Sequence, residues 1–479
     1  MPSAPLVEEG AQRLSRNPGA VVCVDFGSTF TKALLVDVAD GRVLAGAESP
    51  TTLPGAAGGD VLDGFDACLD ALVEQDARAA GAPVLACSSA GGGLRIAVVG
   101  NEELVTAEAG RRVALSSGGK VVAVLSGGLT PASYDALVAA EPDVVLLVGG
   151  TDGGNSAQLV GDAELLAARG WAGPVVVAGD VEAQDRVRSV LEASGTPFVL
   201  ADNVVPRIGV LAPDSARAAI REMFLAHVIG GKHLSSRGDD FLRMVRGATP
   251  DVVLTGVELL ARGLDEEHPG AGDVVVVDVG GATTDVHSIV EIDPEKSELA
   301  REVVAVSAVT RTVEGDLGMR WSAVSTVEAA GLDGLHDAAV ARRDDPDLVP
   351  TDEAEWEADE AIARAAVGLA LKRHAGRSRV VLSPEGRVVE RTGKDLREVD
   401  LLVGSGGALR NGRAGVVRRV LLPSTGDHVD GGWQLPREPR VVVDQDYVLA
   451  AAGLLAGPHP AAAHGLLDGL RAAAGQAGR

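Results

Sequence analysis

The sequence predicts an α/β fold in which one structural unit occurs twice, with an α/β insertion in the first copy. An apolar strand, an aspartate, a glycine turn and a returning strand occur at 21–38, and the same arrangement recurs at 274–292. Between these segments, apolar strands alternate with polar stretches of helical period, which is typical of a parallel sheet covered by helices. The chain is 46% hydrophobic but only 3% aromatic, so its core must consist mainly of Val, Leu, Ala and Ile.

The order of these patterns divides the chain into four parts. We expect a flexible polar tail (1–19), a first half (20–265), a second half (266–457) and an Ala/Gly-rich tail (458–479). Within the first half, repeated strand–helix units over about 94–212 form the insertion, and 214–264 is mostly helical.

In the first half, the strand at 21–24 turns at Gly27 and Ser28 and returns at 33–36. A third strand follows at 42–47, and a helix over 63–80 places its apolar residues on one face. In the insertion, short apolar runs predict strands at Val121–Leu125, Val144–Val148, Val175–Ala178 and Phe198–Ala201.

The second half repeats this plan with different residues. After its hairpin, a third strand is predicted at Glu302–Val306 and a long helix at Ala361–Arg373. A glycine loop at 404–407 follows a short strand, and 441–457 reads as a last strand leading into a helix of small residues.

The bulk properties limit the classes of function. A chain of 479 residues is longer than one ordinary domain. Its 68 acidic and 43 basic residues give a net charge of −25, which disfavours nucleic acid and anionic lipid as partners. Three isolated cysteines (Cys23, Cys68 and Cys87), without a CxxC pair, are typical of a reducing compartment. With no membrane-spanning apolar run and no signal-peptide pattern, we expect a cytoplasmic protein that binds neither nucleic acid nor membrane.

The first glycine turn carries groups that suit an anion. Gly27 permits close approach of the backbone, and successive amides of such a turn can point at one anion. Thr29 and Thr31 add hydroxyl donors and Lys32 adds a positive charge, while Asp25 precedes the turn. An ordinary hairpin explains the same residues, so this turn alone does not show that the protein binds phosphate.

The second turn has the same construction, with Asp278 and Asp285 at its ends. Carboxylates contact phosphate favourably only with a cation between them. Aspartates beside amide-rich turns therefore predict Mg²⁺, held directly or through its waters. A third loop, 404–407, lies at a strand end where the backbone must pass close to something flat or bulky. We interpret it as an adenosine site, with tight strand–helix packing as the alternative.

Two such hairpins followed by a late glycine loop resemble the ATPase superfamily of actin, Hsp70 and the sugar kinases. The resemblance implies two ribonuclease H-like halves around a nucleotide cleft. Asp25 and Asp278 would be the catalytic residues and would hold Mg²⁺, with Asp285 beside them. ATP would be bound by the two turns and the late loop, through Gly27, Ser28, Thr29, Thr31, Lys32, Gly280, Gly281, Ala282, Thr283, Asp285, Gly404, Ser405, Gly406 and Gly407.

Hydrolysis would also need a carboxylate or glutamine from a separate segment to position the attacking water. Asp152, in the glycine-rich turn 148–155, is one candidate. A purely structural loop explains that turn equally well. The sequence leaves open whether bound ATP is hydrolysed.

Four segments are similar to the MutL/GlmL family associated with cobalamin-dependent glutamate mutase, and 404–407 and 444–447 agree with it as well. The four are Val24–Lys32, Ala86–Gly93, Val148–Asn155 and Asp278–Asp285. This resemblance, over about 20–457, implies an accessory or reactivating protein that uses ATP to act on a cobalamin-dependent mutase. Around His287, the sequence departs from the cobalt-binding pattern Asp-x-His-x-x-Gly, so we expect no cobalamin on this chain.

Three other functions are compatible with the same fold. A small-molecule kinase of the sugar-kinase type would need a catalytic aspartate facing a substrate hydroxyl. An activator of an acyl-CoA dehydratase would need closely placed, exposed cysteines for an iron–sulfur cluster. A filament-forming, actin-like protein would assemble in response to nucleotide. The sequence does not identify the particular mutase, the oligomeric state or the docking surface.

Overall fold

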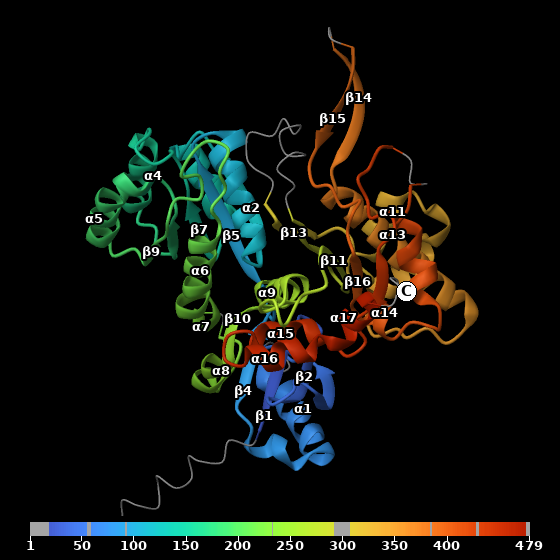
Figure 1. Cartoon of the computed structure of the whole chain (residues 1–479). Helices are drawn as coiled ribbons and strands as arrows, with labels where there is room; N and C mark the ends of the chain where they lie inside the picture. The colour runs from blue at the N-terminus through green and yellow to red at the C-terminus, as the bar shows by residue number, and fades with distance from the viewer. Residues whose placement is uncertain are drawn as a thin grey trace, which may run out of the picture.

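The computed structural model describes residues 19–475, except 55–58, 92, 232, 292–306, 384–385 and 428–430. Most of the expected N-terminal tail and the expected strand Glu302–Val306 lie outside the described residues. The described residues form three five-stranded sheets and one two-stranded ribbon, with helices packed around them (Figure 1).

The first sheet has the strand order β10-β4-β1-β2-β3. β1, β2 and β3 pair antiparallel, and β4 and β10 continue the sheet in parallel on the other side of β1. Every residue of β1 is buried, which explains its nearly continuous apolar run. α1 (Val61–Gln75) packs against β2 and β3 and begins with a capping box at Asp60. The strands are β1 (Ala20–Phe26), β2 (Phe30–Asp37), β3 (Val43–Pro50), β4 (Val84–Ser88) and β10 (Val245–Ala248).

The second sheet repeats this topology, with the order β13-β12-β11-β16-β17. Its pairings match those of the first sheet position by position, with three antiparallel strands followed by two parallel ones. The strands are β11 (Val274–Val279), β12 (Thr284–Ile289), β13 (Val309–Glu314), β16 (Leu401–Ser405) and β17 (Arg440–Val443). The predicted duplication of a ribonuclease H-like unit is confirmed.

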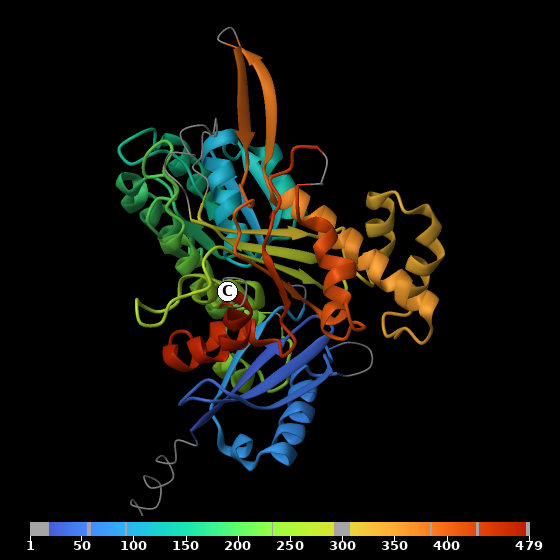
Figure 2. The same ribbon diagram turned by 45° about the vertical axis from the view of Figure 1, so that its right-hand side comes forward.

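The second half also carries helices and a projecting ribbon. Its helices are α11 (Ala323–Ala330), α12 (His336–Asp344), α13 (Glu353–His374) and α14 (Gly407–Arg410). α13 packs against β11 and β12. The ribbon, β14 (Arg377–Ser383) with β15 (Gly386–Thr392), extends away from the body of the molecule in both views (Figures 1 and 2).

The insertion forms a third sheet of five parallel strands in the order β6-β5-β7-β8-β9. The four strands predicted for it overlap β6, β7, β8 and β9, whereas β5 was not predicted. The strands are β5 (Leu94–Gly100), β6 (Gly119–Ser126), β7 (Val144–Leu147), β8 (Val175–Val177) and β9 (Phe198–Leu200). The helices are α2 (Glu108–Ser116), α3 (Pro131–Ala139), α4 (Ala157–Ala168) and α5 (Gln184–Ser194).

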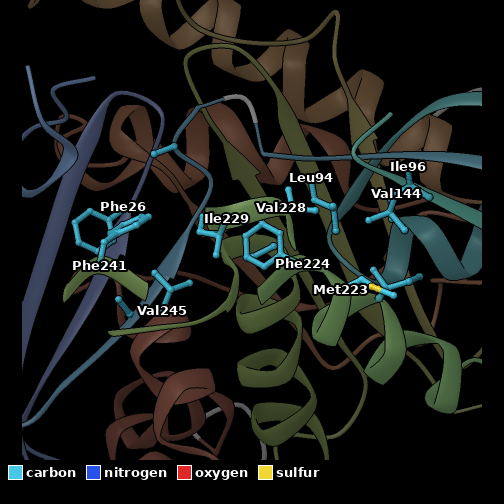
Figure 3. Packing of buried hydrophobic residues seen from close by; sticks show 14 of the residues in the cluster. Phe26, Leu94, Ile96, Val144, Met223, Phe224, Val228, Ile229, Phe241 and Val245 are labelled. Carbon is cyan, nitrogen blue, oxygen red and sulfur yellow. The ribbon is translucent and has the colours of Figure 1, made fainter. Parts of the chain in front are cut away.

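The insertion shares a hydrophobic core with the first half. Figure 3 shows Phe224, Val228 and Ile229 between side chains of the first sheet and side chains of the insertion. These three residues belong to the segment after α6 (Asp214–Met223), where a π-helix at Phe224–Val228 leads into α7 (Ile229–Gly231). α8 (Gly238–Met244) closes the same core with Phe241, which packs edge-on against Phe26. Because one core spans both parts, the insertion is built onto the first half.

Two helices cross between the halves at the centre of the molecule (Figure 1). α9 (Thr249–Arg262) follows the first sheet and α15 (Val448–Leu455) follows the second. A Cβ on Gly256 would lie 2.2 Å from the Leu449 carbonyl oxygen, and one on Gly453 would lie 1.9 Å from the Val252 carbonyl oxygen. The two backbones therefore touch where the helices cross, and only glycine fits at either position.

The segment after 457, expected as an Ala/Gly-rich tail, forms two helices in the described residues. They are α16 (Pro460–Leu466) and α17 (Asp468–Gly475). Leu466, Leu467 and Leu470 are buried in the same cluster as α9 and α15. Because these leucines pack with α9 and α15, the segment belongs to the core between the halves. No helix in the described part of the chain is both long and apolar enough to cross a lipid bilayer.

The helix crossing yields a stability prediction. Gly453→Ala should lower the free energy of unfolding by about 1–3 kcal/mol, because the added methyl group would force two packed backbones apart. Gly161→Ala is the matched control: it lies within α4 and its Cβ would meet no atom within 4 Å. That change should raise the free energy of unfolding by about 0.5–1 kcal/mol. Urea unfolding followed by circular dichroism measures both, and equal effects would contradict the described crossing.

Candidate functional site

The first hairpin presents Asp25 at the end of β1. Asp25 is 4% exposed and lies opposite Lys32 in the antiparallel pairing. Its carboxylate accepts hydrogen bonds from the Thr249 hydroxyl at 2.5 Å and from the Tyr447 hydroxyl at 3.1 Å. The turn is closed by a hydrogen bond from the Gly27 amide to the Phe30 carbonyl at 3.1 Å. Asp25 is therefore held by one residue from the middle of the chain and one from the second half.

The second hairpin has the same closure and is supported from behind. The Gly280 amide donates to the Thr283 carbonyl at 2.9 Å, and Asp278 lies opposite Asp285. The loop after β13 donates hydrogen bonds to the carbonyl groups of this turn. The amides of Met319 and Arg320 and the Ser322 hydroxyl donate to the carbonyls of Gly280, Gly281 and Ala282, at 3.0, 2.8 and 2.6 Å.

The turn amides, in contrast, have no acceptor in the described part of the protein. This holds for Ser28 and Thr29 in the first turn and for Gly281 and Ala282 in the second. Thr31 is different, because it is buried and its hydroxyl is bonded to Thr51 at 3.0 Å. Four of the predicted phosphate-binding amides are thus available to a ligand or to water, while the Thr31 side chain already has a partner.

The late glycine loop lies directly against the second hairpin. Ser405 is the parallel register partner of Asp278. Gly406 has φ +98°, and a Cβ there would lie 2.2 Å from the Val279 carbonyl oxygen and 2.9 Å from an Asp278 carboxylate oxygen. Gly404 packs against Leu421, whereas the Cβ position of Gly407 faces open space. Glycine at 406 is therefore required by its conformation and by contact with the hairpin.

The two hairpins bring their charges to one place. Burial raises the pKa of Asp278 to about 6; Lys32 opposes this rise, whereas the carboxylates of Asp285, Asp25 and Asp444 add to it. No protein donor among the described residues binds the Asp278 carboxylate, and Oδ1 of Asp285 is buried without a partner. Four carboxylates facing one ammonium group create a strong local demand for a cation.

Tyr447 fills the space between Asp25 and Lys32. The Lys32 ammonium lies 3.5 Å from the centre of the Tyr447 ring, and Arg410 lies 5.3 Å from it. Burial, together with the Asp25 charge, holds the pKa of Tyr447 well above its ordinary value. Tyr447 has φ +57°, an uncommon conformation for a bulky residue. Such local strain often accompanies functional sites.

Three residues of the site were not among those predicted. Thr249 and Tyr447 bind Asp25, and Asp444 accepts the amides of Val448 and Leu449 at the start of α15, at 2.9 and 3.3 Å. An aspartate shortly before an apolar helical run is a recognisable helix-capping signal and could have identified Asp444. Thr249 and Tyr447 reach Asp25 across 224 and 422 residues, and no local pattern indicates such a pairing.

Two cavities are lined by the described residues, and the first of them includes residues of the first hairpin. One, of about 330 Å³, is lined by the first sheet, α14 and the start of α15, with Asp25, Lys32, Glu48, Arg410, Asp446 and Tyr447 among its walls. The other, of about 750 Å³, lies between α13 and 413–419, just beyond α14. Both sizes fall in the range of small-molecule sites.

Asp152 lies apart from both hairpins. In the turn after β7, its carboxylate accepts hydrogen bonds from the Asn203 side chain at 2.8 Å and the Val181 amide at 3.3 Å. Its own amide donates to the Pro206 carbonyl at 3.2 Å. All of these partners belong to the insertion or its edge. None of these hydrogen bonds involves a hairpin, and a role for Asp152 in hydrolysis stays a prediction.

The described residues contain no cluster of three or more His, Cys, Asp or Glu side chains that could hold a metal directly. The three cysteines are all buried, and burial raises the pKa of Cys23 to about 12 and that of Cys68 to about 11. Their burial argues against a cluster-bearing dehydratase activator.

The raised pKa of Asp278 yields a prediction for the ligand-free protein. Because the folded pKa of about 6 exceeds the ordinary value of 3.8, the folded state retains this proton to higher pH than the unfolded state. The free energy of unfolding should therefore fall as pH rises from about 4 to about 6. Asp278→Asn should remove this part of the pH dependence, on the order of 3 kcal/mol at 1.36 kcal/mol per pKa unit. Chemical unfolding of both proteins between pH 4 and pH 8 measures the difference; parallel curves would contradict the burial of this charge.

The chain is similar to known proteins over most of its length. A family model described as "MutL protein" matches residues 21–469. Protein MutL of Clostridium tetanomorphum is 36% identical over 450 residues, covering 91% of this chain and 96% of that protein.

Two solved structures are more distantly similar. Ethanolamine utilization protein EutJ from Carboxydothermus hydrogenoformans has 12% identity and a TM-score of 0.28, over 93% of this chain and 89% of that one. Xylulose kinase from Bifidobacterium adolescentis has 10% identity and a TM-score of 0.28, over 94% and 93%. These TM-scores are too low to support an argument, whereas the family match and the Clostridium relative both span most of the sequence. The chain therefore belongs to the MutL protein family.

Proposed function

We propose that this protein binds Mg²⁺–ATP between its two hairpins and acts as an accessory or reactivating protein for a cobalamin-dependent mutase of the glutamate mutase type. One observation carries the nucleotide site: Asp25 and Lys32 from one half and Asp278 and Asp285 from the other share a single charged site beside unpaired turn amides. The partner is inferred from membership of the MutL family.

Each group in the site has a role in this proposal. The amides of Ser28, Thr29, Gly281 and Ala282 would bind phosphate oxygens, as amide-rich turns do in other nucleotide sites. Asp25 and Asp278 would hold the waters of Mg²⁺, and Lys32 would offset phosphate charge. When bound, Mg²⁺ would neutralise the carboxylates and the phosphates together. The adenosine would lie against the glycine loop 404–407, which contacts the second hairpin through Gly406.

Nucleotide turnover could do mechanical work because the site is divided between the halves. Like charges from two lobes repel until a cation joins them, so bound Mg²⁺–ATP favours a closed arrangement. A partner that binds one arrangement more tightly would be driven by turnover. A radical cobalamin enzyme that has lost its adenosyl group needs such an outside source of free energy to release the inactive cofactor.

A second candidate is a small-molecule kinase, favoured by the cavity of about 330 Å³ beside the first hairpin. Acidic groups (Asp25, Glu48 and Asp446) and basic groups (Lys32 and Arg410) all line it, a mixture that suits a polar substrate. A kinase would consume ATP in the presence of a polyol or hydroxy acid and release a phosphorylated product. The reactivating role instead requires ATP turnover that responds to the mutase.

The proposed function is tested by Mg²⁺–ATP binding and hydrolysis, measured with the purified protein alone and with inactivated glutamate mutase. We expect binding without the mutase, and turnover that increases when the mutase is added and restores its activity. Binding without a response to the mutase would contradict the proposed partner. Absence of Mg²⁺-dependent binding would contradict the nucleotide site itself.

A single substitution tests the metal-dependent site. Asp278→Ala should weaken Mg²⁺–ATP binding at least about tenfold, equivalent to 1.4 kcal/mol, because half of the carboxylate pair proposed for the cation is lost. Asp135→Ala on the exposed face of α3 is the matched control and should bind as the wild type does. Isothermal titration of each protein, with circular dichroism to check folding, gives the comparison. Unchanged affinity in Asp278→Ala would rule out the role assigned to this hairpin.

A further inference from the structure

A buried arginine on the edge strand of the second sheet joins three parts of the molecule. Arg311 lies on β13 and is 4% exposed. One terminal nitrogen donates to Oδ2 of Asp285 at 3.2 Å, and the other donates to the Leu115 carbonyl at 3.2 Å. Asp285 belongs to the second hairpin, where it faces Asp278, and Leu115 belongs to α2 of the insertion. One side chain therefore connects the proposed nucleotide site to the insertion.

The contact at Leu115 is suited to a cation. Leu115 lies in the last turn of α2, where carbonyl groups lack partners within the helix and the helix dipole is negative. Its carbonyl also accepts the Gly118 amide at 3.1 Å, in the turn that leads from α2 into β6. α2 packs against β13, so the hydrogen bond lies within a larger contact. The planar guanidinium can donate to two acceptors at once, which a lysine ammonium at this distance cannot do with the same geometry.

The two acceptors belong to different halves. Asp285 moves with the second sheet. Leu115 moves with the first half, because the insertion and the first sheet share one hydrophobic core (Figure 3). Any change in the placement of the halves must therefore alter the Arg311–Leu115 contact, the Arg311–Asp285 contact, or both.

The Arg311–Asp285 ion pair also lacks some hydrogen-bond partners next to the proposed site. Oδ1 of Asp285 and Nε of Arg311 are buried without hydrogen-bond partners in the described structure. Buried polar atoms are seldom left unpaired, and an unpaired carboxylate oxygen beside Asp278 is a group that a cation or its bound water can satisfy. Occupation of the site would fix the Asp285 carboxylate, and with it the arginine that it holds.

We propose that Arg311 is a positioning residue that holds Asp285 in the nucleotide site and transmits occupation of that site to the end of α2. This inference rests on the proposed binding of Mg²⁺–ATP and extends it to a route by which the insertion responds. The insertion thereby becomes the part of the first half whose stability depends on the state of the second hairpin.

Hydrogen exchange at the end of α2 tests the proposal. In the wild-type protein, saturating Mg²⁺–ATP should slow exchange of the amides of 113–119 several-fold, because Arg311 then holds the Leu115 carbonyl in one position. In Arg311→Met, at nucleotide concentrations that saturate the variant, this slowing should be lost. Arg311→Lys keeps the charge but not the double donation, and should bind nucleotide more nearly like the wild type while also losing the slowing.

Arg373→Met is the matched control. Arg373 binds Glu314 and Asp316, at and beyond the end of the same strand, at 2.7 and 2.6 Å, and among the described residues it contacts neither Asp285 nor the insertion through a hydrogen bond. Its loss should leave the ligand-dependent slowing intact. If Arg311→Met does not fold, the double variant Arg311→Met/Asp285→Asn removes the buried charge that the single variant leaves unpaired.

The outcomes separate the two proposals. If wild-type protein does not bind Mg²⁺–ATP, the proposed function fails. If wild-type and Arg311 variants bind it and show the same slowing at 113–119, the function stands and the role of Arg311 is refuted. Slowing that is lost in the Arg311 variants but kept in Arg373→Met is the result expected.

Discussion

The organisation of this protein depends on the repulsion among a few carboxylates at the boundary of its two halves. Asp25 comes from the first half, whereas Asp278, Asp285 and Asp444 come from the second, with Lys32 the ammonium group identified among them. Bringing such charges out of water is unfavourable unless a cation or donor compensates. Thr249 and Tyr447 compensate Asp25, whereas Asp278 has no protein donor among the described residues. The uncompensated carboxylates therefore destabilise the boundary between the halves. A cation that binds among them would favour its closure.

Much of this arrangement could be predicted from sequence because it is encoded locally. The strand–aspartate–glycine turn–strand pattern of each hairpin is contained within a single short segment, and its duplication is visible without knowing how the copies pack. The strands of the insertion were likewise found as short apolar runs. The strand Leu94–Gly100, which follows directly after a glycine loop, was not predicted.

The residues whose roles were not predicted from the sequence mostly share one property. Tyr447, Thr249 and Arg311 act through partners far away in the chain, so their roles follow from packing and not from neighbouring residues. Leu466 in α16 and Leu470 in α17 lie in a segment rich in Ala and Gly, and this composition did not indicate their burial. For Asp152, the sequence pattern indicated a site where the structure shows local hydrogen bonds. Its glycine-rich turn resembles the hairpin turns in composition, yet its side chain is bonded within the insertion. Composition identifies a tight turn but not what the turn faces.

The backbone contact between α9 and α15 has a consequence for how such a sequence can diverge. Gly256 and Gly453 each face a carbonyl group of the other helix, so no side-chain rotamer can absorb an added methyl group at either position. A change at one site cannot be rescued by shrinking its neighbour, because the neighbour is main chain. Mutational drift at this crossing is therefore blocked at both positions, while surrounding leucines and valines remain free to exchange with one another. In a distant relative, two glycines at these places would locate the joint between the halves even where the hairpins had become unrecognisable.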